Sequence, residues 1–155
     1  MKIADTFTIR APKPDVWDVF MDVAKLAGCV PGCKDLVARS ETEYEADMEV
    51  KTKFMTIGFK ANGQLKECTE GEELVVEMTG KPMKLAGLFR TKLRVRLQER
   101  GGTETEVAYD MDLQMSGRLA SLGDVMMRGT VVDSSRQFAA NVQRLFEAPQ
   151  GGSRG

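Results

Sequence analysis

Histidine is absent from the 155 residues of the chain. This residue is the commonest general base near neutral pH, the usual activator of a nucleophile and the commonest metal ligand in proteins. Its absence argues against an ordinary catalytic triad and against a zinc site. We therefore expect no catalytic residue and no metal site.

Three cysteines, Cys29, Cys33 and Cys68, could still support redox or metal chemistry. The spacing of Cys29 and Cys33 matches neither a redox C-x-x-C motif nor part of a four-ligand zinc set. Pro31 and Gly32 lie between them and predict a turn over 28–33. A structural loop is the favoured interpretation, and a metal or redox role is the alternative. Three cysteines also agree with a reducing compartment.

Tyr109 is the best candidate for acid–base chemistry, because it lies on the apolar face of a predicted strand. No acid–base pair accompanies it, so an enzyme of the cyclase or hydrolase kind is only the alternative interpretation. The ten methionines fall mostly on predicted buried faces. Their flexible side chains suit either an ordinary core or a deformable pocket wall.

The elements that would position these residues are a strand, a short helix, six more strands and a long closing helix. Alternating apolar residues predict strands over 2–10, 35–40, 44–54, 57–69, 73–80, 86–99 and 104–116. A stripe that includes Trp17 and Phe20 predicts the short helix, with Trp17 as a structural anchor. Helical spacing predicts one closing helix over 119–146, in which Gly123 and Gly129 either pack closely or mark a kink.

The hairpin between the last two strands carries charges of opposite sign on its outer face. A turn at Gly101-Gly102-Thr103 would place Arg94 opposite Asp110 and Lys92 opposite Asp112. The basic row is then neutralised within the sheet, which favours a solvated face over a phosphate or membrane patch.

Composition indicates one domain over residues 1–147 and a disordered tail over 148–155. The chain is 42% hydrophobic, and its net charge of −1 gives no electrostatic case for nucleic acid as a partner. The N-terminus has no signal-peptide pattern, so we expect a cytoplasmic protein. Short connections between strands favour an antiparallel sheet and an α+β fold.

Four segments of the sequence resemble the carbon monoxide dehydrogenase G-subunit family. They are Phe7–Pro12 with Val16-Trp17, Cys29–Gly32, Ser116–Gly123 and Phe138–Asn141. This family belongs to the START-like (SRPBCC) superfamily of polyketide cyclases and lipid-transfer proteins. The resemblance covers residues 1 to about 147. It agrees with a helix-grip fold, in which a curved antiparallel sheet of about seven strands surrounds a long C-terminal helix, with short helices after strand 1.

The resemblance implies a non-catalytic accessory protein of a carbon monoxide dehydrogenase-type molybdenum hydroxylase. The resemblance further implies a role in recruitment of the enzyme to the membrane, in its assembly or in quinone handling. Many relatives extend beyond the last helix into a tail associated with membrane attachment, whereas this chain stops at Gly155. We therefore expect transient contact with the inner face of the membrane rather than a stable anchor.

The inward face of the predicted sheet suits an apolar quinone- or lipid-like ligand, without a covalent cofactor. The residues expected to bind it are Phe54, Phe59, Leu65, Met78, Leu85, Leu88, Leu93, Tyr109, Met111, Met115, Leu119, Leu122 and Met126. The segment 83–89 is predicted as an entrance or as a bulged strand start. Met127 lies off the main helical stripe and is a candidate for a portal or a partner surface. The alternative function is a ligand-free assembly or recruitment factor that grips the partner enzyme.

Overall fold

The computed structural model describes the backbone of residues 1–152 and the side chains of residues 1–147. The strands are β1 (Lys2–Ile9), β2 (Cys33–Ala38), β3 (Glu43–Lys51), β4 (Thr56–Thr69), β5 (Glu73–Pro82), β6 (Gly87–Arg100) and β7 (Glu104–Ser116). The helices are α1 (Lys13–Met21), α2 (Val23–Cys29), α3 (Gly117–Ala120) and α4 (Asp124–Gly152).

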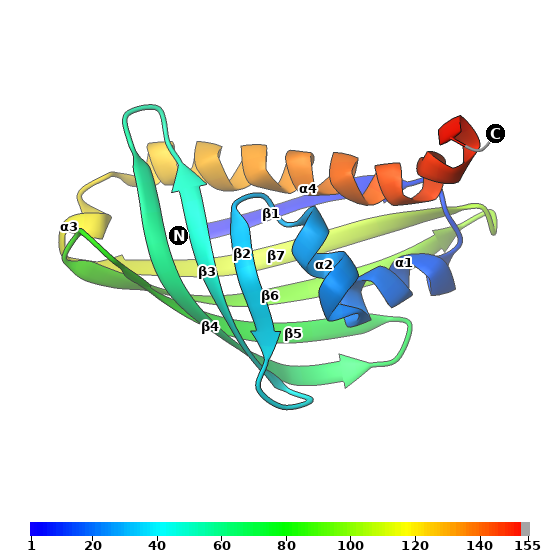
Figure 1. The fold of residues 1–155 in the computed structure, drawn as a ribbon, viewed down its shortest axis with the longest axis horizontal. Helices are drawn as coiled ribbons and strands as arrows, with labels where there is room; N and C mark the ends of the chain where they lie inside the picture. The colour runs from blue at the N-terminus through cyan, green and yellow to red at the C-terminus, as the bar shows by residue number, and fades with distance from the viewer. Residues whose placement is uncertain (153–155) are drawn as a thin grey trace.

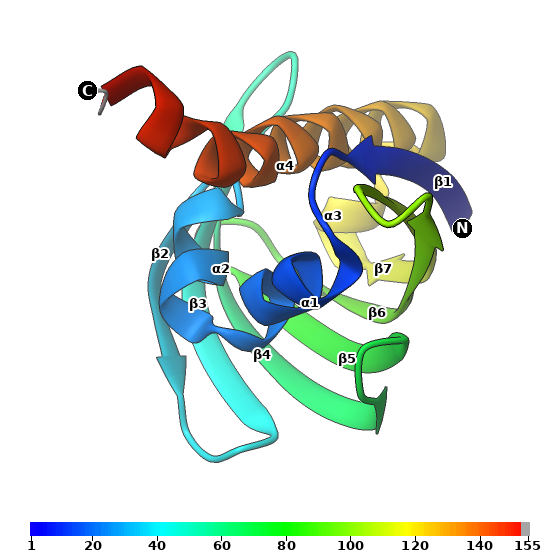
Figure 2. The same cartoon turned by 90° about the vertical axis from the view of Figure 1, so that its right-hand side faces the viewer.

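The strands form one antiparallel sheet in the order β1-β7-β6-β5-β4-β3-β2. Figure 2 shows that the sheet curves strongly around the interior, with α4 lying across its open side. Short hairpins join β2 through β7 in sequence. The first strand, β1, pairs with β7 and forms the edge of the sheet opposite β2. The predicted α+β helix-grip arrangement is confirmed.

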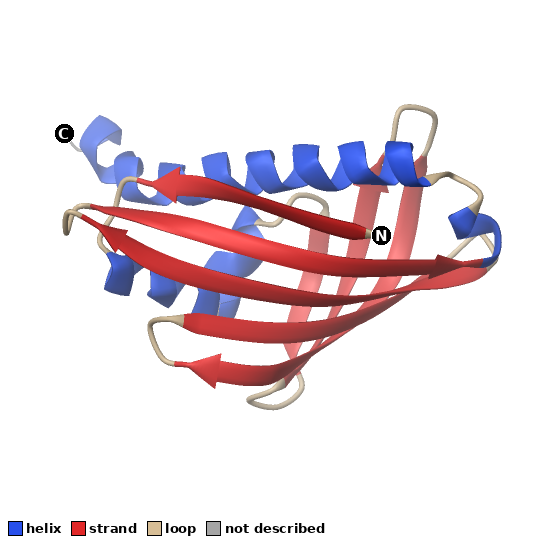
Figure 3. Ribbon diagram, turned by 180° about the vertical axis from the view of Figure 1, so that it is seen from behind, coloured by secondary structure: helices blue, strands red, loops and turns tan. Residues whose placement is uncertain are grey.

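The long helix α4 follows the edge strand β1 along much of its length (Figures 1 and 3). The backbone N–H of Arg10 donates to Oε1 of Gln143 at 2.7 Å. Near the other end of β1, Arg128 Nη1 donates to the backbone oxygen of Lys2 at 2.7 Å. These contacts fasten the helix to the sheet edge at two separated points.

The segment after β1 divides into two helices, α1 and α2, which confirms the short helices that the family resemblance implied, whereas the apolar stripe alone predicted one helix. The backbone of Asp22 is extended there, and its Oδ1 accepts hydrogen bonds from the N–H groups of Ala24 and Lys25, at 3.0 and 3.1 Å. Asp22 is thus an N-cap that starts a second helix. Gly28 and Cys29 belong to α2, so the predicted turn over 28–33 begins two residues later.

The closing helix begins at Asp124, so the prediction that it starts at residue 119 is wrong. Gly123 lies outside it with a φ of +89°, a conformation that turns the chain between α3 and α4. Gly129 lies inside α4, but a Cβ added there would meet nothing within 4 Å. Close packing is therefore not the reason for glycine at position 129. Of the predicted tail over 148–155, residues 148–152 continue the backbone of α4, and residues 153–155 lie outside the described residues.

The predicted register of the β6–β7 hairpin is confirmed, with Arg94 opposite Asp110 and Lys92 opposite Asp112. The ion pairs nevertheless use a third strand. Arg94 and Arg96 both contact the carboxylate of Glu73 on β5, and Arg96 also lies 4.0 Å from Asp110. The outer face is therefore a mixed-charge network that spans three strands.

Candidate ligand-binding site

Two clusters of buried apolar residues close the interior, and the larger cluster includes the region where α1 and α2 cover the sheet (Figure 2). Ile9, Val16, Val107 and Val142 are at most 1% exposed in this core. They come from β1, α1, β7 and α4, so one apolar cluster joins all the layers at this end. Burial of this kind stabilises the fold by about 25 cal/mol for each Å² of apolar surface.

A second, separate core closes the opposite end beside α3 (Figure 1). Ile57, Phe59 and Leu119 are buried there, and Phe59 meets Phe89 edge to face with ring centroids 5.2 Å apart. Glycine makes this closure possible, because a Cβ on Gly117 would lie 2.7 Å from Cα of Gly87. Only unsubstituted backbones could approach so closely.

The middle of the inward face lies between these two cores and is apolar but incompletely covered. Its partly accessible residues are Leu65, Val76, Met78, Leu93 and Met111, and all of them except Met78 also pack against the first core. The floor beside them is built from small residues, since Ala61 and Gly63 on β4 face Gly80 and Met78 on β5. A partly accessible apolar face between two buried clusters is the candidate site for an apolar ligand.

The hydroxyl groups near this middle region are not alike. Tyr109 donates to Oγ of Ser135 at 2.8 Å, and Ser135 in turn donates to the backbone oxygen of Val132 at 2.9 Å. Thr130 donates to the backbone oxygen of Met126 at 2.9 Å. In contrast, the Oγ1 atom of Thr91 is buried and has no hydrogen-bond partner among the described residues.

Most of the predicted ligand-binding residues lie on the inward side or in the cores that border it. These residues are Phe59, Leu65, Met78, Leu85, Leu93, Tyr109, Met111, Met115, Leu119 and Leu122. Met126 is partly buried on α4 and belongs to neither core. Leu85 belongs to the loop between β5 and β6 and packs on the second core, so the segment 83–86 is a loop rather than a bulged strand start. Contact of these side chains with a ligand remains a prediction.

Three placements need correction. Phe54 is 81% exposed, because β3 ends at Lys51 and the Thr52 hydroxyl organises a tight turn with the backbone of Met55. Leu88 is 46% exposed, since it alternates with the inward-facing residues of β6. Met127 is only 7% exposed and offers no open portal or partner surface.

Sequence reasoning missed Thr91, which is 2% exposed and lies on the same face of β6 as Leu93 and Val95. The alternation that placed Leu93 inward also placed Thr91 inward. The polar residue at an inward position of this strand therefore indicated Thr91 as a candidate site residue from the sequence alone.

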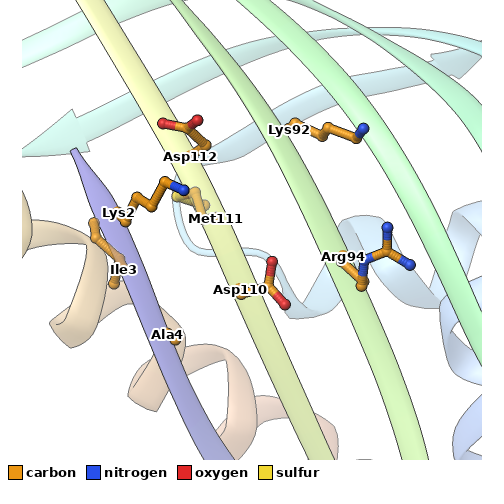
Figure 4. A pocket seen from close by; sticks show the side chains of 8 residues that line it. All are labelled: Lys2, Ile3, Ala4, Lys92, Arg94, Asp110, Met111 and Asp112. Carbon is orange, nitrogen blue, oxygen red and sulfur yellow. The ribbon is translucent and has the colours of Figure 1, made fainter.

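The outer face of the sheet carries a shallow depression of about 380 Å³ over β1, β7 and β6 (Figure 4). Lys2, Lys92 and Arg94 line it together with Asp110 and Asp112, so charges of both signs surround it. A depression of this kind suits solvent and ion pairs rather than an apolar ligand. The inward face remains the better candidate site.

The thiols of Cys29 and Cys33 are placed for packing rather than reactivity. Cys29 is 1% exposed, and burial raises the pKa of its thiol. Burial also raises the pKa of the Cys33 thiol, with a smaller contribution from Asp35. Both shifts reduce the thiolate fraction that redox and metal chemistry require. Within the described side chains, no three potential metal ligands gather in one place.

Four large apolar side chains with high exposure belong to segments near the α3 end of the molecule, and Figure 1 shows the backbone of these segments. Phe54 and Met55 occupy the loop between β3 and β4, Met83 follows β5, and Val125 lies in the first turn of α4. Their exposed fractions are 81, 44, 61 and 88%. Among the helices that the structure describes, none combines the length and apolar character needed to cross a membrane.

The solved structures most similar in fold include a conserved protein from Geobacillus kaustophilus, with a TM-score of 0.88 and 18% identity over 96% of this chain and 97% of the other. A START superfamily protein from Mycobacterium smegmatis has a TM-score of 0.73 and 14% identity, with coverage of 95 and 97%. The Zhui aromatase/cyclase from a Streptomyces species has a TM-score of 0.71 and 14% identity, with coverage of 100 and 98%. At these identities the likeness establishes the fold alone.

The comparison with curated proteins gave no match. The sequence pattern of one family, however, extends through nearly all the elements described above. It matches residues 6–146, from β1 into the last third of α4. The chain therefore belongs to the carbon monoxide dehydrogenase G-subunit (CoxG) family.

Proposed function

We propose that the protein is a non-catalytic carrier of an apolar, quinone- or lipid-like ligand, which it holds between the sheet and α4. The observation that carries this proposal is the apolar middle of the inward face, still partly accessible between two sealed cores. Apolar walls supply affinity without directional demands. The methionines Met78 and Met111 add side chains that adapt to a ligand of variable shape.

The same interior offers little support for an enzyme. Tyr109 is the inward-facing residue that we considered for acid–base chemistry, and its hydroxyl donates to Ser135. The Ser135 hydroxyl in turn donates to the backbone oxygen of Val132 on α4. This chain of bonds joins sheet to helix and favours a structural role for Tyr109. The aromatase/cyclase named above shares the fold, but fold likeness alone does not transfer its activity.

Membership of the family supports a partner of the carbon monoxide dehydrogenase type. We propose that the protein works beside such a molybdenum hydroxylase, in the cytoplasm and at the inner face of the membrane. An apolar ligand of low solubility would then pass between membrane and enzyme without crossing water. The alternative is an assembly factor that contacts the enzyme and holds no ligand.

The exposed apolar end is the surface that we propose for membrane contact. Phe54 lies at the tip of its loop beside Lys53, and Met83 lies beside Lys84. Lysines next to exposed apolar side chains match an anionic lipid surface, in which the rings and thioethers enter the headgroup layer while the ammonium groups meet phosphates. This end also borders the second core, so a ligand would have a short path to the interior.

The binding proposal can be tested by narrowing the interior from its floor. Ala61 faces inward on β4, whereas the next residue, Asn62, is exposed on the outer face. We expect Ala61→Leu to weaken binding of a decyl-substituted benzoquinone at least about tenfold, because the added side chain occupies the accessible space. Asn62→Leu places the same leucine side chain on the outer face of the strand and should leave the affinity unchanged.

The titration would follow quinone absorbance or native mass, with thermal unfolding as a check that both variants are folded. Equal affinity of Ala61→Leu and Asn62→Leu would contradict binding on the inward face. If the wild-type protein bound no quinone and no lipid, the assembly-factor alternative would replace the carrier.

A further inference from the structure

The hydroxyl group of Thr91 is the unexplained polar feature of the interior. The residue is 2% exposed, and Oγ1 has no hydrogen-bond partner among the described side chains and backbone. Most buried polar atoms in proteins are hydrogen-bonded, because a buried group without a partner loses its bonds to water and gains none in return. An exception inside an otherwise apolar face therefore needs a physical reason.

The surroundings of Thr91 are apolar on every side that the sheet provides. β6 pairs with β5 and β7 without a register shift, which places Met78 opposite Thr91 on one side and Leu113 on the other. Two residues away along β6, the same face carries Phe89 and Leu93. These neighbours provide no side-chain acceptor for the hydroxyl.

Three other buried or partly buried hydroxyls are satisfied within the protein. Thr105 donates to the backbone oxygen of Ala11 at 2.8 Å. Tyr109 and Thr130 donate to Ser135 and to the backbone oxygen of Met126. The hydroxyl of Thr91 therefore lacks the hydrogen bond that these other hydroxyls make. Thr91 lies where the accessible middle of the inward face meets the second core.

We propose that Thr91 is the polar anchor of the ligand site and that its Oγ–H donates to an oxygen atom of the enclosed ligand. This inference rests on the proposed carrier function and narrows the ligand class. The ligand would be an apolar molecule that carries a hydrogen-bond-accepting oxygen, such as a ring carbonyl, and not a pure hydrocarbon. A hydrocarbon would leave the hydroxyl without a partner, so the site would discriminate against it.

A buried water is a poorer partner for Thr91 than such a ligand. Ordered internal waters usually make two to four hydrogen bonds to polar protein groups. The side chains that flank Thr91 in the sheet, Met78, Leu113, Phe89 and Leu93, offer no strong donor or acceptor. An apolar ligand with one acceptor oxygen would contact the apolar neighbours of Thr91 and would also accept the hydrogen bond of its hydroxyl.

Two probes of similar apolar content can test the anchor. One is a decyl-substituted benzoquinone, which has ring carbonyls, and the other is decylbenzene, which has none. Thr91→Val removes the hydroxyl and keeps the shape, whereas Thr91→Ser keeps the hydroxyl. Thr79→Val is the matched control, because Thr79 is exposed on the outer face of β5.

We expect Thr91→Val to weaken quinone binding by about 2- to 12-fold, the range of one net hydrogen bond, and to leave decylbenzene binding equal or tighter. Thr91→Ser should retain most of the quinone affinity, and Thr79→Val should bind like the wild type. In the absence of ligand, Thr91→Val should unfold at the same or a higher temperature than the wild type, because it removes an unpartnered hydroxyl.

The outcomes separate the anchor from the carrier function. If wild type binds the quinone and Thr91→Val binds both probes as the wild type does, or loses both equally, the anchor is overturned while the carrier function stands. A large drop in the unfolding temperature of ligand-free Thr91→Val would also overturn it, since the hydroxyl would then have a partner within the protein. If the wild type binds neither probe, both proposals fail together.

Discussion

Asn141 on α4 donates a hydrogen bond of 2.8 Å from Nδ2 to the backbone oxygen of Cys29, the last residue of α2. The two residues are 112 positions apart in the sequence. Both lie in segments that carry the family resemblance, Cys29–Gly32 and Phe138–Asn141. The contact therefore explains part of that resemblance as structure, because a side-chain amide terminates one helix from another.

Removal of this contact should destabilise the fold. We expect Asn141→Ala to lower the free energy of unfolding by about 1–3 kcal/mol, since the buried carbonyl of Cys29 would lose its partner. Gln137→Ala is the control, because Gln137 donates to Oδ1 of Asn141 from an exposed position. Chemical denaturation of the wild type and the two variants measures these free energies of unfolding. Equal stability of the two variants would show that the bond from Asn141 to Cys29 contributes little to stability.

A second prediction compares Gly32, in the turn that follows α2, with Gly71, in the turn between β4 and β5. Gly32 has a φ of +74°, and a Cβ added there would lie 1.9 Å from the backbone oxygen of Glu49. Gly71 has a φ of +76°, with nothing within 4 Å of an added Cβ. Gly71→Ala should lower the free energy of unfolding by about 1–2 kcal/mol through its backbone conformation alone.

Gly32→Ala should lose at least about 1 kcal/mol more than Gly71→Ala, because the backbone of Glu49 has to move. Glu49 also donates its N–H to the oxygen of Gly32 at 2.9 Å, so the movement would strain a hydrogen bond. Thermal and chemical unfolding of both variants give the comparison. Equal losses would mean that close approach does not select glycine at position 32.

The bond between Tyr109 and Ser135 should contribute to stability. Tyr109→Phe and Ser135→Ala each remove it, and the double variant removes it only once. We expect a coupling energy of about 0.5–1.5 kcal/mol in a double-mutant cycle of unfolding free energies. Coupling near zero would free the Tyr109 hydroxyl for another role and strengthen the case for chemistry at that residue.

The sequence predicted the fold well where long strands have one apolar face. The alternation through 104–116 placed Tyr109 and Met111 inward, and the glycine turn at 101–103 set the register of Arg94 against Asp110. The sequence did not predict that Arg94 would contact Glu73, because that choice depends on the register of a third strand. Long arginine side chains reach acceptors on either neighbouring strand.

Local turns and caps account for other differences. Phe54 was assigned to a strand face because the apolar alternation continues into a turn held by the Thr52 hydroxyl. Asp22 was a readable N-cap, yet the apolar stripe on both sides of it favoured one helix. The sequence could not predict that the Thr91 hydroxyl lacks a hydrogen-bond partner, because this depends on which side chains the folded chain places around it.

Alkaline pH should weaken the fold through its buried thiols. Because burial raises the pKa of Cys29, its unfolded form loses the proton at a lower pH than its folded form. The stabilisation is therefore complete below the ordinary thiol pKa, and it declines as the pH rises from there through the higher folded pKa. We expect the unfolding temperature to fall above about pH 8.5.

Cys29→Ala should show a shallower decline with pH than the wild type, although its stability at neutral pH will be lower. Cys33 contributes a decline of the same sign in both proteins. Cys68→Ala is the control, because Cys68 is exposed. A slope in Cys29→Ala identical to that of the wild type would remove Cys29 as a source of the pH dependence.

The proposed membrane contact predicts a separate effect of Phe54. Phe54→Ser should reduce binding to vesicles that contain anionic phospholipid, with little change in the unfolding temperature, because its side chain is 81% exposed. Val37→Ser is a matched control at a 42% exposed position on the edge strand β2. Cosedimentation with neutral and anionic vesicles measures both, and equal binding of the two variants would contradict contact through the Phe54 loop.

The carrier function depends most directly on whether the purified protein holds a ligand. Native mass spectrometry, followed by solvent extraction and identification of the extract, answers this without a chosen probe. We predict a near-stoichiometric mass above that of the bare chain and an extract that contains an apolar molecule with at least one oxygen acceptor. If every molecule has the bare chain mass, and added quinones and lipids also fail to bind, the carrier function is wrong and a ligand-free assembly role becomes the better account.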